Sequence, residues 1–283
     1  MLNLVPLTPV DYLVIGHLAC DLTPGGPRLG GTASYAALTA RALGLRVGIV
    51  TAWAGEVPLD GVLDGIQVLN VEVEHSTTFE NIYTLEGRIQ ILHHAAPDLK
   101  FEDIPAAWRQ APVVHIGPIA GEARLVAYGK FPASMLGLTP QGWLRFWEAD
   151  GHVRAGPWPE ALQTLSRANA AVLSLEDVGG DEELIEAMAG ACRVLAVTEG
   201  AAGSRLYWNG DLRRFPAMQV QQVDPTGAGD IFAAAFFWRY STTRDPWAAA
   251  RFATHLASFS VTRVGLAGIP TREEIQTCLV EVM

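Results

Sequence analysis

Short apolar runs that can be buried on both faces alternate with helical patterns along most of this chain. Such strands are typical of a parallel sheet with helices on each side. The helical patterns between them include residues 32–43, which end before Gly44, and residues 181–189. The runs are YLVIG at 12–16, VGIVT at 47–51, VVHIG at 113–117, AVLSL at 171–175 and VLAVT at 194–198. This alternation predicts an α/β fold, a doubly wound, mostly parallel sheet with helices on both faces.

Two segments depart from this rhythm. Residues 67–92 alternate apolar and polar side chains, with a turn near Glu86 and Gly87, which is typical of an antiparallel hairpin with one solvated face. Residues 137–159 carry three tryptophans among Gly and Pro, which indicates a loop-rich segment ordered by aromatic packing. A length of 283 residues suits one large α/β domain or two small ones, and no linker divides the chain.

We therefore expect one domain over residues 1–283 that carries a small β flap, or lid. Residues of about 17–30 and 67–95 are expected to contribute the lid strands.

The composition excludes several classes of protein. With 49% hydrophobic and 18% charged residues the chain is globular rather than disordered. No charge-free apolar run approaches the roughly 18 to 20 residues of a membrane-spanning helix. The three cysteines lie far apart, so they predict neither a disulfide framework nor a CxxC metal site. The N-terminus lacks the basic region of a signal peptide, and we expect a cytoplasmic protein.

The charge balance bears on binding partners. A formal net charge of −10 without a basic cluster argues against nucleic-acid binding. An acidic protein can still bind an anion locally through backbone amides.

The strongest chemical signal is the segment DPTGAGD at 224–230, followed by the apolar helical run 231–240. Small residues at 227–229 let backbone N–H groups approach an anion at the N-terminus of that helix. Asp230 would lie in the first turn, where it could accept a proton from a hydroxyl that attacks a phosphoryl group. The alternative is a glycine-rich turn whose Asp only caps the helix. Six of the seven residues in this segment agree with such a site, which favours the functional interpretation over a simple turn.

This chain resembles the ribokinase/PfkB family of carbohydrate kinases, whose signature is D-x-x-G-A-G-D. Gly30-Gly31 before the first helix, T-x-G-x-x-G at 198–203 and the apolar run 249–265 match further family motifs in the same order. The segments GGTASY, TTFENIY and VDPTGAGD are most similar to inositol-kinase-like members. The resemblance implies a ribokinase-like fold.

The resemblance also implies a role for each matching residue. Phosphoryl transfer is assigned to Asp230 as catalytic base, with the amides of Gly227, Ala228 and Gly229 around the phosphate. Substrate binding is assigned to Asp21, Gly30, Gly31, Ser34, Tyr35, Asn81 and Arg145. Asn81 is alternatively part of a polar hairpin face, and Arg145, which could also reach a phosphate, is alternatively a solvated loop residue. ATP binding is assigned to Thr198, Gly200, Gly203, Thr226, Gly227, Gly229 and Thr254.

Some positions depart from the family pattern. The N-x-x-E motif that supports Mg²⁺ is represented by SLED at 174–177, so Glu176 or Asp177 is expected to hold Mg²⁺ through water, and either is alternatively a plain loop acid. Asp224 and Thr226 match positions near a monovalent-cation (K⁺) site in the family. Tyr35 replaces an Asn that touches sugar hydroxyls, which implies a different ring or hydroxyl pattern in the substrate.

These observations predict an ATP- and Mg²⁺-dependent kinase that phosphorylates a hydroxyl of a sugar or an inositol-like polyol. The alternatives are a nucleoside kinase of the same fold and a non-catalytic ligand sensor that kept the fold. A dinucleotide-dependent oxidoreductase is not expected, because no GxGxxG follows the first strand. A small polyol and ATP are the expected partners, and the chain is expected to be a monomer or a homodimer.

Overall fold

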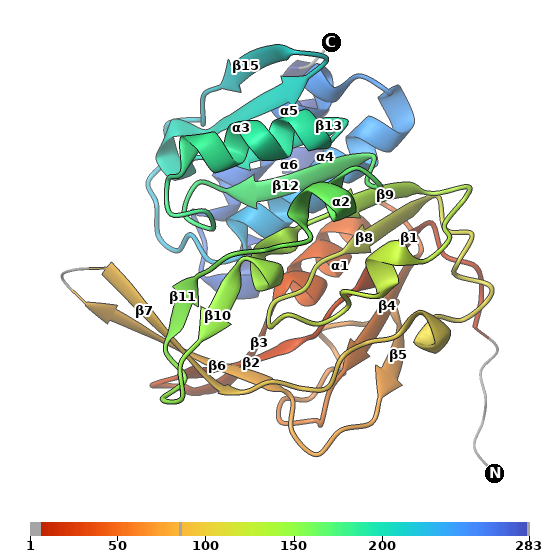
Figure 1. Ribbon diagram of the computed structural model, residues 1–283, viewed down its shortest axis with the longest axis vertical. Helices are drawn as coiled ribbons and strands as arrows, with labels where there is room; N and C mark the ends of the chain where they lie inside the picture. The colour runs from red at the N-terminus through yellow and green to blue at the C-terminus, as the bar shows by residue number, and fades with distance from the viewer. Residues whose placement is uncertain (1–6, 85–86, 282–283) are drawn as a thin grey trace.

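A nine-stranded sheet forms the centre of the molecule in this computed structural model, which describes residues 7–84 and 87–281 (Figure 1). The strand order is β15-β14-β13-β12-β9-β8-β1-β4-β5. All pairs from β13 to β5 are parallel, and β14 and β15 add an antiparallel edge. The strands are β1 (Tyr12–Ile15), β4 (Val47–Ala52), β5 (Gln67–Val71), β8 (Val113–Ile116), β9 (Met135–Leu138), β12 (Ala170–Ser174), β13 (Val194–Thr198), β14 (Ser204–Trp208) and β15 (Asp211–Phe215).

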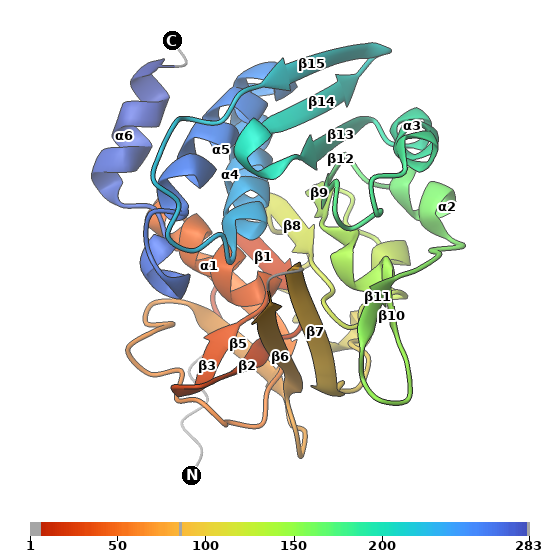
Figure 2. The ribbon, with the colours of Figure 1, turned by 90° about the vertical axis from the view of Figure 1, so that its left-hand side faces the viewer.

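Helices cover both faces of this sheet. Figure 2 shows α1 (Thr32–Ala42), α4 (Ala228–Thr243), α5 (Pro246–Ser260) and α6 (Arg272–Glu281) on one side, and α2 (Ala161–Leu165) and α3 (Glu182–Ala191) on the other. Along β1, Tyr12 and Val14 belong to the core beneath α1, α4 and α5, whereas Leu13 and Ile15 belong to the core on the opposite face. Successive strand residues point to opposite faces, so a strand between two helical layers must be apolar throughout. The predicted doubly wound α/β architecture is therefore confirmed.

The five apolar runs all form strands, with ends that differ from the predicted ones by one residue at most. The two predicted helices correspond to α1 and α3. In the part of the chain that the structure describes, no helix is both long and apolar enough to cross a membrane.

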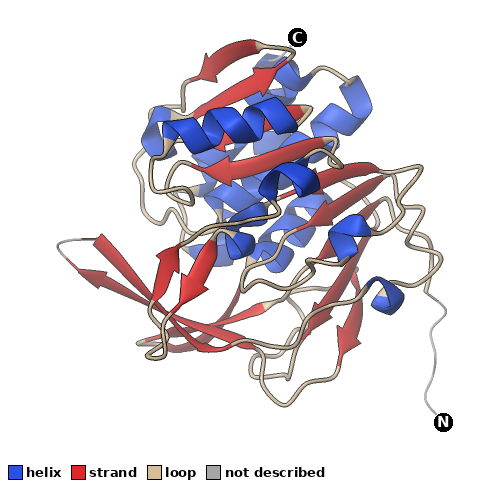
Figure 3. Ribbon diagram, viewed as in Figure 1, coloured by secondary structure: helices blue, strands red, loops and turns tan. Residues whose placement is uncertain are grey.

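A second sheet of four strands forms the expected lid, with the order β3-β2-β6-β7. Figure 3 shows these strands, in red, as a separate layer at the lower left of the main sheet. They are β2 (Ala19–Thr23), β3 (Gly26–Gly30), β6 (Thr77–Thr84) and β7 (Gly87–His94). The predicted turn near Glu86 falls partly outside the described residues.

One boundary of the predicted lid is wrong. Residues 67–71 form β5, which pairs with β4 in parallel at the edge of the main sheet rather than in the lid. An edge strand alternates like a lid strand, because both leave part of their surface in solvent. The side chain of Asn70 bonds the backbone of Trp53 at this edge, so the polar positions of the pattern serve the main sheet.

The tryptophan-rich segment contains a hairpin that the sequence did not predict, β10 (Arg145–Trp147) with β11 (Val153–Ala155). Trp143 is buried, and its ring centroid lies 5.1 Å from that of Trp158, so aromatic packing does order the segment. The hairpin also meets the lid edge, because the Leu92 amide of β7 donates to the Gly151 carbonyl at 2.8 Å.

Candidate active site

A pocket of about 920 Å³ lies between the lid and the carboxyl ends of the parallel strands. Lid residues of β2 and β6, the ends of β12 and β13, and residues of α1, α4 and α5 line it. Open α/β sheets bind their ligands at this edge. The segments that resemble family motifs thus meet around one cavity.

The DPTGAGD segment forms the turn that opens α4. Gly227 is the N-cap and has a φ of 79°, which is the left-handed region that favours glycine. A Cβ at Gly227 would also overlap with the ring of Tyr35. A Cβ at Gly229 would meet no atom within 4 Å, so open space adjoins the backbone here. The first amides of α4 lack partners within the helix and face a region suited to an anion.

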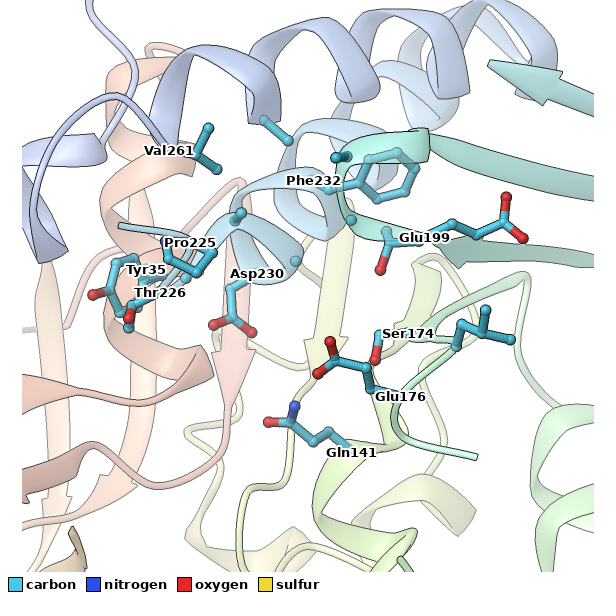
Figure 4. Close-up of a pocket in the computed structure, with 18 of the residues that line it drawn as sticks. Tyr35, Gln141, Ser174, Glu176, Glu199, Pro225, Thr226, Asp230, Phe232 and Val261 are labelled. Carbon is cyan, nitrogen blue, oxygen red and sulfur yellow. The ribbon is translucent and has the colours of Figure 1, made fainter. Parts of the chain in front are cut away.

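Asp230 lies in the first turn of α4, and its carboxylate points into the pocket (Figure 4). Thr32 Oγ1 donates to Asp230 Oδ1 at 2.6 Å. Burial raises the pKa of Asp230 to about 6, opposed by the Thr32 hydrogen bond and by Arg145 and reinforced by the carboxylates of Asp177 and Asp21. A carboxylate with this pKa is mostly ionised at neutral pH. Its pKa is also close enough to that pH for the carboxylate to accept a proton.

One half of the pocket lies under the lid, and we call it the acceptor half because predicted substrate residues line it. Five of the predicted substrate residues line it: Asp21, Gly31, Tyr35, Asn81 and Arg145. Asn81 and Gln90 face each other across β6 and β7, and Gln90 Nε2 donates to Asn81 Oδ1 at 3.0 Å. Tyr35 lies beside Pro225 and Thr226 (Figure 4), so it supports the phosphate turn as well as lining the pocket.

Two predicted substrate residues do not line the pocket. Ser34 is fully buried, and its hydroxyl donates to the carbonyls of Gly30 and Gly31, both at 2.9 Å. Gly30 is packed against the carboxylate of Asp21, which a Cβ would overlap. These residues therefore hold the turn before α1, and Gly31 is the residue of the Gly-Gly pair that lines the pocket.

Sequence reasoning missed several lining residues, namely Thr32, Phe79, Gln90, Ile119 and Gln141. The sequence positions of two of them, Phe79 and Ile119, could have predicted their place in the pocket. Phe79 shares a strand face with Asn81, two residues on, and Ile119 follows the carboxyl end of β8.

The other half of the pocket lies between the β13–β14 turn, α4 and α5, and we call it the donor half because the predicted ATP residues line it. All of the predicted ATP residues line the pocket: Thr198, Gly200, Gly203, Thr226, Gly227, Gly229 and Thr254. Ala201, Val220, Ala257 and Val261 add an apolar wall of the kind that accepts a flat base.

The two acids expected near Mg²⁺ differ in position. Glu176 lines the pocket, and Figure 4 shows its carboxylate on the Asp230 side. Asp177 does not line it, because its oxygens accept from Gln141 Nε2 at 3.1 Å and from the Ser174 amide at 2.9 Å. The described residues contain no cluster of three or more His, Cys, Asp or Glu suited to a metal ion. One carboxylate oxygen donor fits a Mg²⁺ that is held mainly by phosphates and water.

Asp224, expected near a monovalent cation, ties two backbone segments together. Its oxygens accept from the amides of Thr226 and Gly265, each at 2.9 Å. Burial would raise the pKa of Asp224, but these hydrogen bonds outweigh it and keep the pKa below its usual range. A cation at this site stays a prediction.

This chain is similar to known proteins in sequence and in fold. The sequence model of the pfkB family carbohydrate kinases matches residues 162–272. A cytidine kinase of Thermococcus kodakarensis is 28% identical over 256 residues, which cover 83% of this chain and 90% of that protein. An inositol 3-kinase of Zea mays is 35% identical over 135 residues, 44% of this chain and 33% of that protein.

A solved structure described as a pyrophosphate-dependent kinase in the ribokinase family, in complex with a pyrophosphate analogue and myo-inositol, superimposes with a TM-score of 0.78. It is 20% identical and covers 94% of this chain and 99% of that one, which shows a shared fold. The chain thus contains a PfkB family carbohydrate kinase domain, which the family model matches over residues 162–272, and it is similar in sequence and fold to ribokinase-family phosphotransferases that act on an alcohol group.

Proposed function

We propose that this kinase transfers the γ-phosphoryl group of ATP to a hydroxyl of a small sugar or cyclitol, with Asp230 as general base. The observation that carries the proposal is the position of Asp230, at the N-terminus of α4, where the donor and acceptor halves of one pocket meet. Its raised pKa, about 6, suits proton acceptance near neutral pH.

In the reaction, the acceptor hydroxyl gives its proton to the Asp230 carboxylate. The oxygen of the acceptor hydroxyl forms a bond to the γ-phosphorus. At the same time the bond from that phosphorus to the bridging oxygen breaks, and ADP leaves. Amides of residues 227–230 would stabilise the charge on the transferring group. Glu176, which lines the pocket, would help hold a Mg²⁺ ion, and this ion would neutralise charge on the phosphates. The lid would exclude water that could otherwise take the phosphoryl group.

The donor half favours ATP over pyrophosphate. Pyrophosphate carries no base, and it would leave the apolar wall of Ala201, Val220, Ala257 and Val261 without a partner. The choice between ATP and pyrophosphate as donor has to be made, because a solved structure of the same fold belongs to a pyrophosphate-dependent kinase. The apolar wall is the feature that favours ATP.

A nucleoside is a second candidate acceptor. The cytidine kinase similarity extends over most of the chain, and the acceptor half contains the buried apolar side chains Phe79 and Ile119, against which a planar base could lie. The polar pair Asn81 and Gln90 suits either class of acceptor, since its amides can bond hydroxyls or base edges.

A matrix of donors and acceptors tests the proposal. The purified protein is incubated with ATP or pyrophosphate and with myo-inositol, other cyclitols, sugars and nucleosides, and phosphorylated product is identified by mass spectrometry. We expect ATP-dependent phosphorylation of one cyclitol or sugar. Selective phosphorylation of a nucleoside would establish the second candidate, and pyrophosphate dependence would refute the donor assignment. No stimulation by any acceptor would refute the function.

A further inference from the structure

Thr32 connects the acceptor-binding turn to the catalytic carboxylate. It is the first residue of α1, directly after Gly31, and only 2% of its surface is exposed. Its hydroxyl donates to Asp230 Oδ1 at 2.6 Å, across 198 positions of sequence. This hydrogen bond joins the N-termini of α1 and α4, which also meet where the Tyr35 ring packs against Gly227.

The rotamer of Thr32 is fixed by its methyl group. That methyl packs against Gly117, just beyond β8, where a Cβ would overlap with it. The same space is bounded by Thr139 Oγ1, which bonds the buried His115 ring at 2.9 Å. A β-branched side chain has few accessible χ1 states, so seating the methyl also directs the hydroxyl.

We infer that Thr32 is a positioning residue for the catalytic base. Its hydroxyl holds Oδ1 of Asp230, orients the carboxylate and leaves Oδ2 to receive the proton of the acceptor. The inference rests on the proposed function, because it assigns Thr32 a role only through Asp230.

The donated hydrogen bond also sets the pH range in which the base is ionised. Asp177, beyond β12, and Asp21, on β2, raise the pKa of Asp230 beyond the effect of burial, whereas Arg145 on β10 lowers it together with Thr32. A donor to the carboxylate favours the charged form. Loss of the Thr32 hydroxyl therefore moves the acidic limb of the activity profile to higher pH.

The test compares Thr32→Val, which keeps the shape and removes the hydroxyl, with Thr32→Ser, which keeps the hydroxyl. Thr39→Val is the matched control, because Thr39 lies on the same helix, is fully buried, and its hydroxyl has no hydrogen-bond partner in the described structure. Turnover with ATP and the best acceptor is measured from pH 5 to pH 9 for each variant, together with wild type and Asp230→Asn.

We expect Thr32→Val to shift the acidic limb upward by about one pH unit, so that the loss of kcat at pH 6 is about five times the loss at pH 8.5. Thr32→Ser keeps the hydroxyl but loses the methyl that directs it, so its limb should lie closer to that of wild type than to that of Thr32→Val, and Thr39→Val should match wild type throughout. A loss in Thr32→Val that is uniform over pH, or no loss, overturns the inference while leaving Asp230 as base. Wild-type turnover by Asp230→Asn would instead overturn the proposed base itself.

Discussion

Asp230 lowers the stability of the native state at neutral pH. Its pKa is about 6 in the folded protein against an ordinary value of 3.8, because burial disfavours the charged form. The folded state therefore binds a proton at the Asp230 carboxyl group more tightly than the unfolded state does. The stability that this provides is fully present below pH 3.8 and is lost as the pH rises through 6.

Replacing Asp230 with Asn should therefore stabilise the protein while removing its activity. The amide has the shape of the carboxylate, and its oxygen can still accept from Thr32. We expect the free energy of unfolding to rise by about 1 to 3 kcal/mol at pH 7.5 and to change little at pH 4, with turnover reduced at least about 100-fold. Urea unfolding at both pH values and an activity assay measure these effects. A variant that is destabilised at pH 7.5 would contradict the burial argument.

For single residues, the sequence predicts where the backbone lies better than it predicts where a side chain points. Asp230 and Gly227 were predictable because their positions in a contiguous motif determine their place at the start of a helix. Ser34 and Asp177 lie within matching segments, yet their side chains bond backbone or neighbouring groups rather than entering the pocket. Ser34 turns back to nearby carbonyls, whereas Asp177 also accepts from Gln141, 36 positions away. Thr32, whose partner lies 198 positions away, shows the same limit.

At the scale of elements, the turn between β13 and β14 is held by a buried arginine. Arg205 on β14 is 4% exposed, its Nη1 lies 2.8 Å from Glu182 Oε2, and its Nε lies 3.2 Å from Glu199 Oε1. Glu199 belongs to the turn that lines the donor half of the pocket. The arginine thus neutralises and orients an acid beside the expected position of the nucleotide.

Arg205→Met should weaken nucleotide binding more than acceptor binding. Without the guanidinium, Glu199 keeps a half-buried charge with no partner, and the turn can shift to reach water. We expect KM for ATP to rise several-fold while KM for the acceptor changes less than twofold, as measured by initial rates. Glu182→Gln is the control, since it removes only the more exposed partner of Arg205 and should alter KM for ATP little. Equal changes in both KM values would indicate a general loss of structure.

Strand position was predictable where a strand is apolar on both faces, because nothing but a covered sheet explains such runs. The prediction was wrong for β5, whose edge position gives it the alternation of a lid strand. It missed β10 and β11, which have three residues each and too short a pattern to detect.

For the whole molecule, the β10–β11 hairpin links the lid to the main body. It begins at Arg145, which lines the acceptor half, and its far end pairs with the lid edge through a bridge between Ile91 and His152. Through this contact, a movement of the lid would displace the segment that carries Arg145. Sequence patterns predicted that a lid exists, but the partner at its edge depends on how distant segments pack.

Gly151→Ala should loosen this contact between hairpin and lid. Gly151 has a φ of 84°, and a Cβ there would lie 2.6 Å from the Leu92 carbonyl oxygen that belongs to the lid edge. Gly210→Ala is a matched control, because Gly210 has a φ of 83° on the β14–β15 turn and its Cβ would meet no atom within 4 Å. Both substitutions carry a similar backbone strain of about 1 kcal/mol, so a difference between them reports the collision.

We expect Gly151→Ala to raise KM for the acceptor several-fold, to leave KM for ATP within twofold, and to increase ATP hydrolysis in the absence of acceptor. A lid that closes less completely admits water to the phosphoryl group, which accounts for the hydrolysis. Initial rates of product formation and of phosphate release measure the two effects. If Gly151→Ala and Gly210→Ala give the same acceptor KM and the same hydrolysis, the hairpin does not hold the lid, and closure must depend on the contacts of β2 and β6 with the acceptor alone.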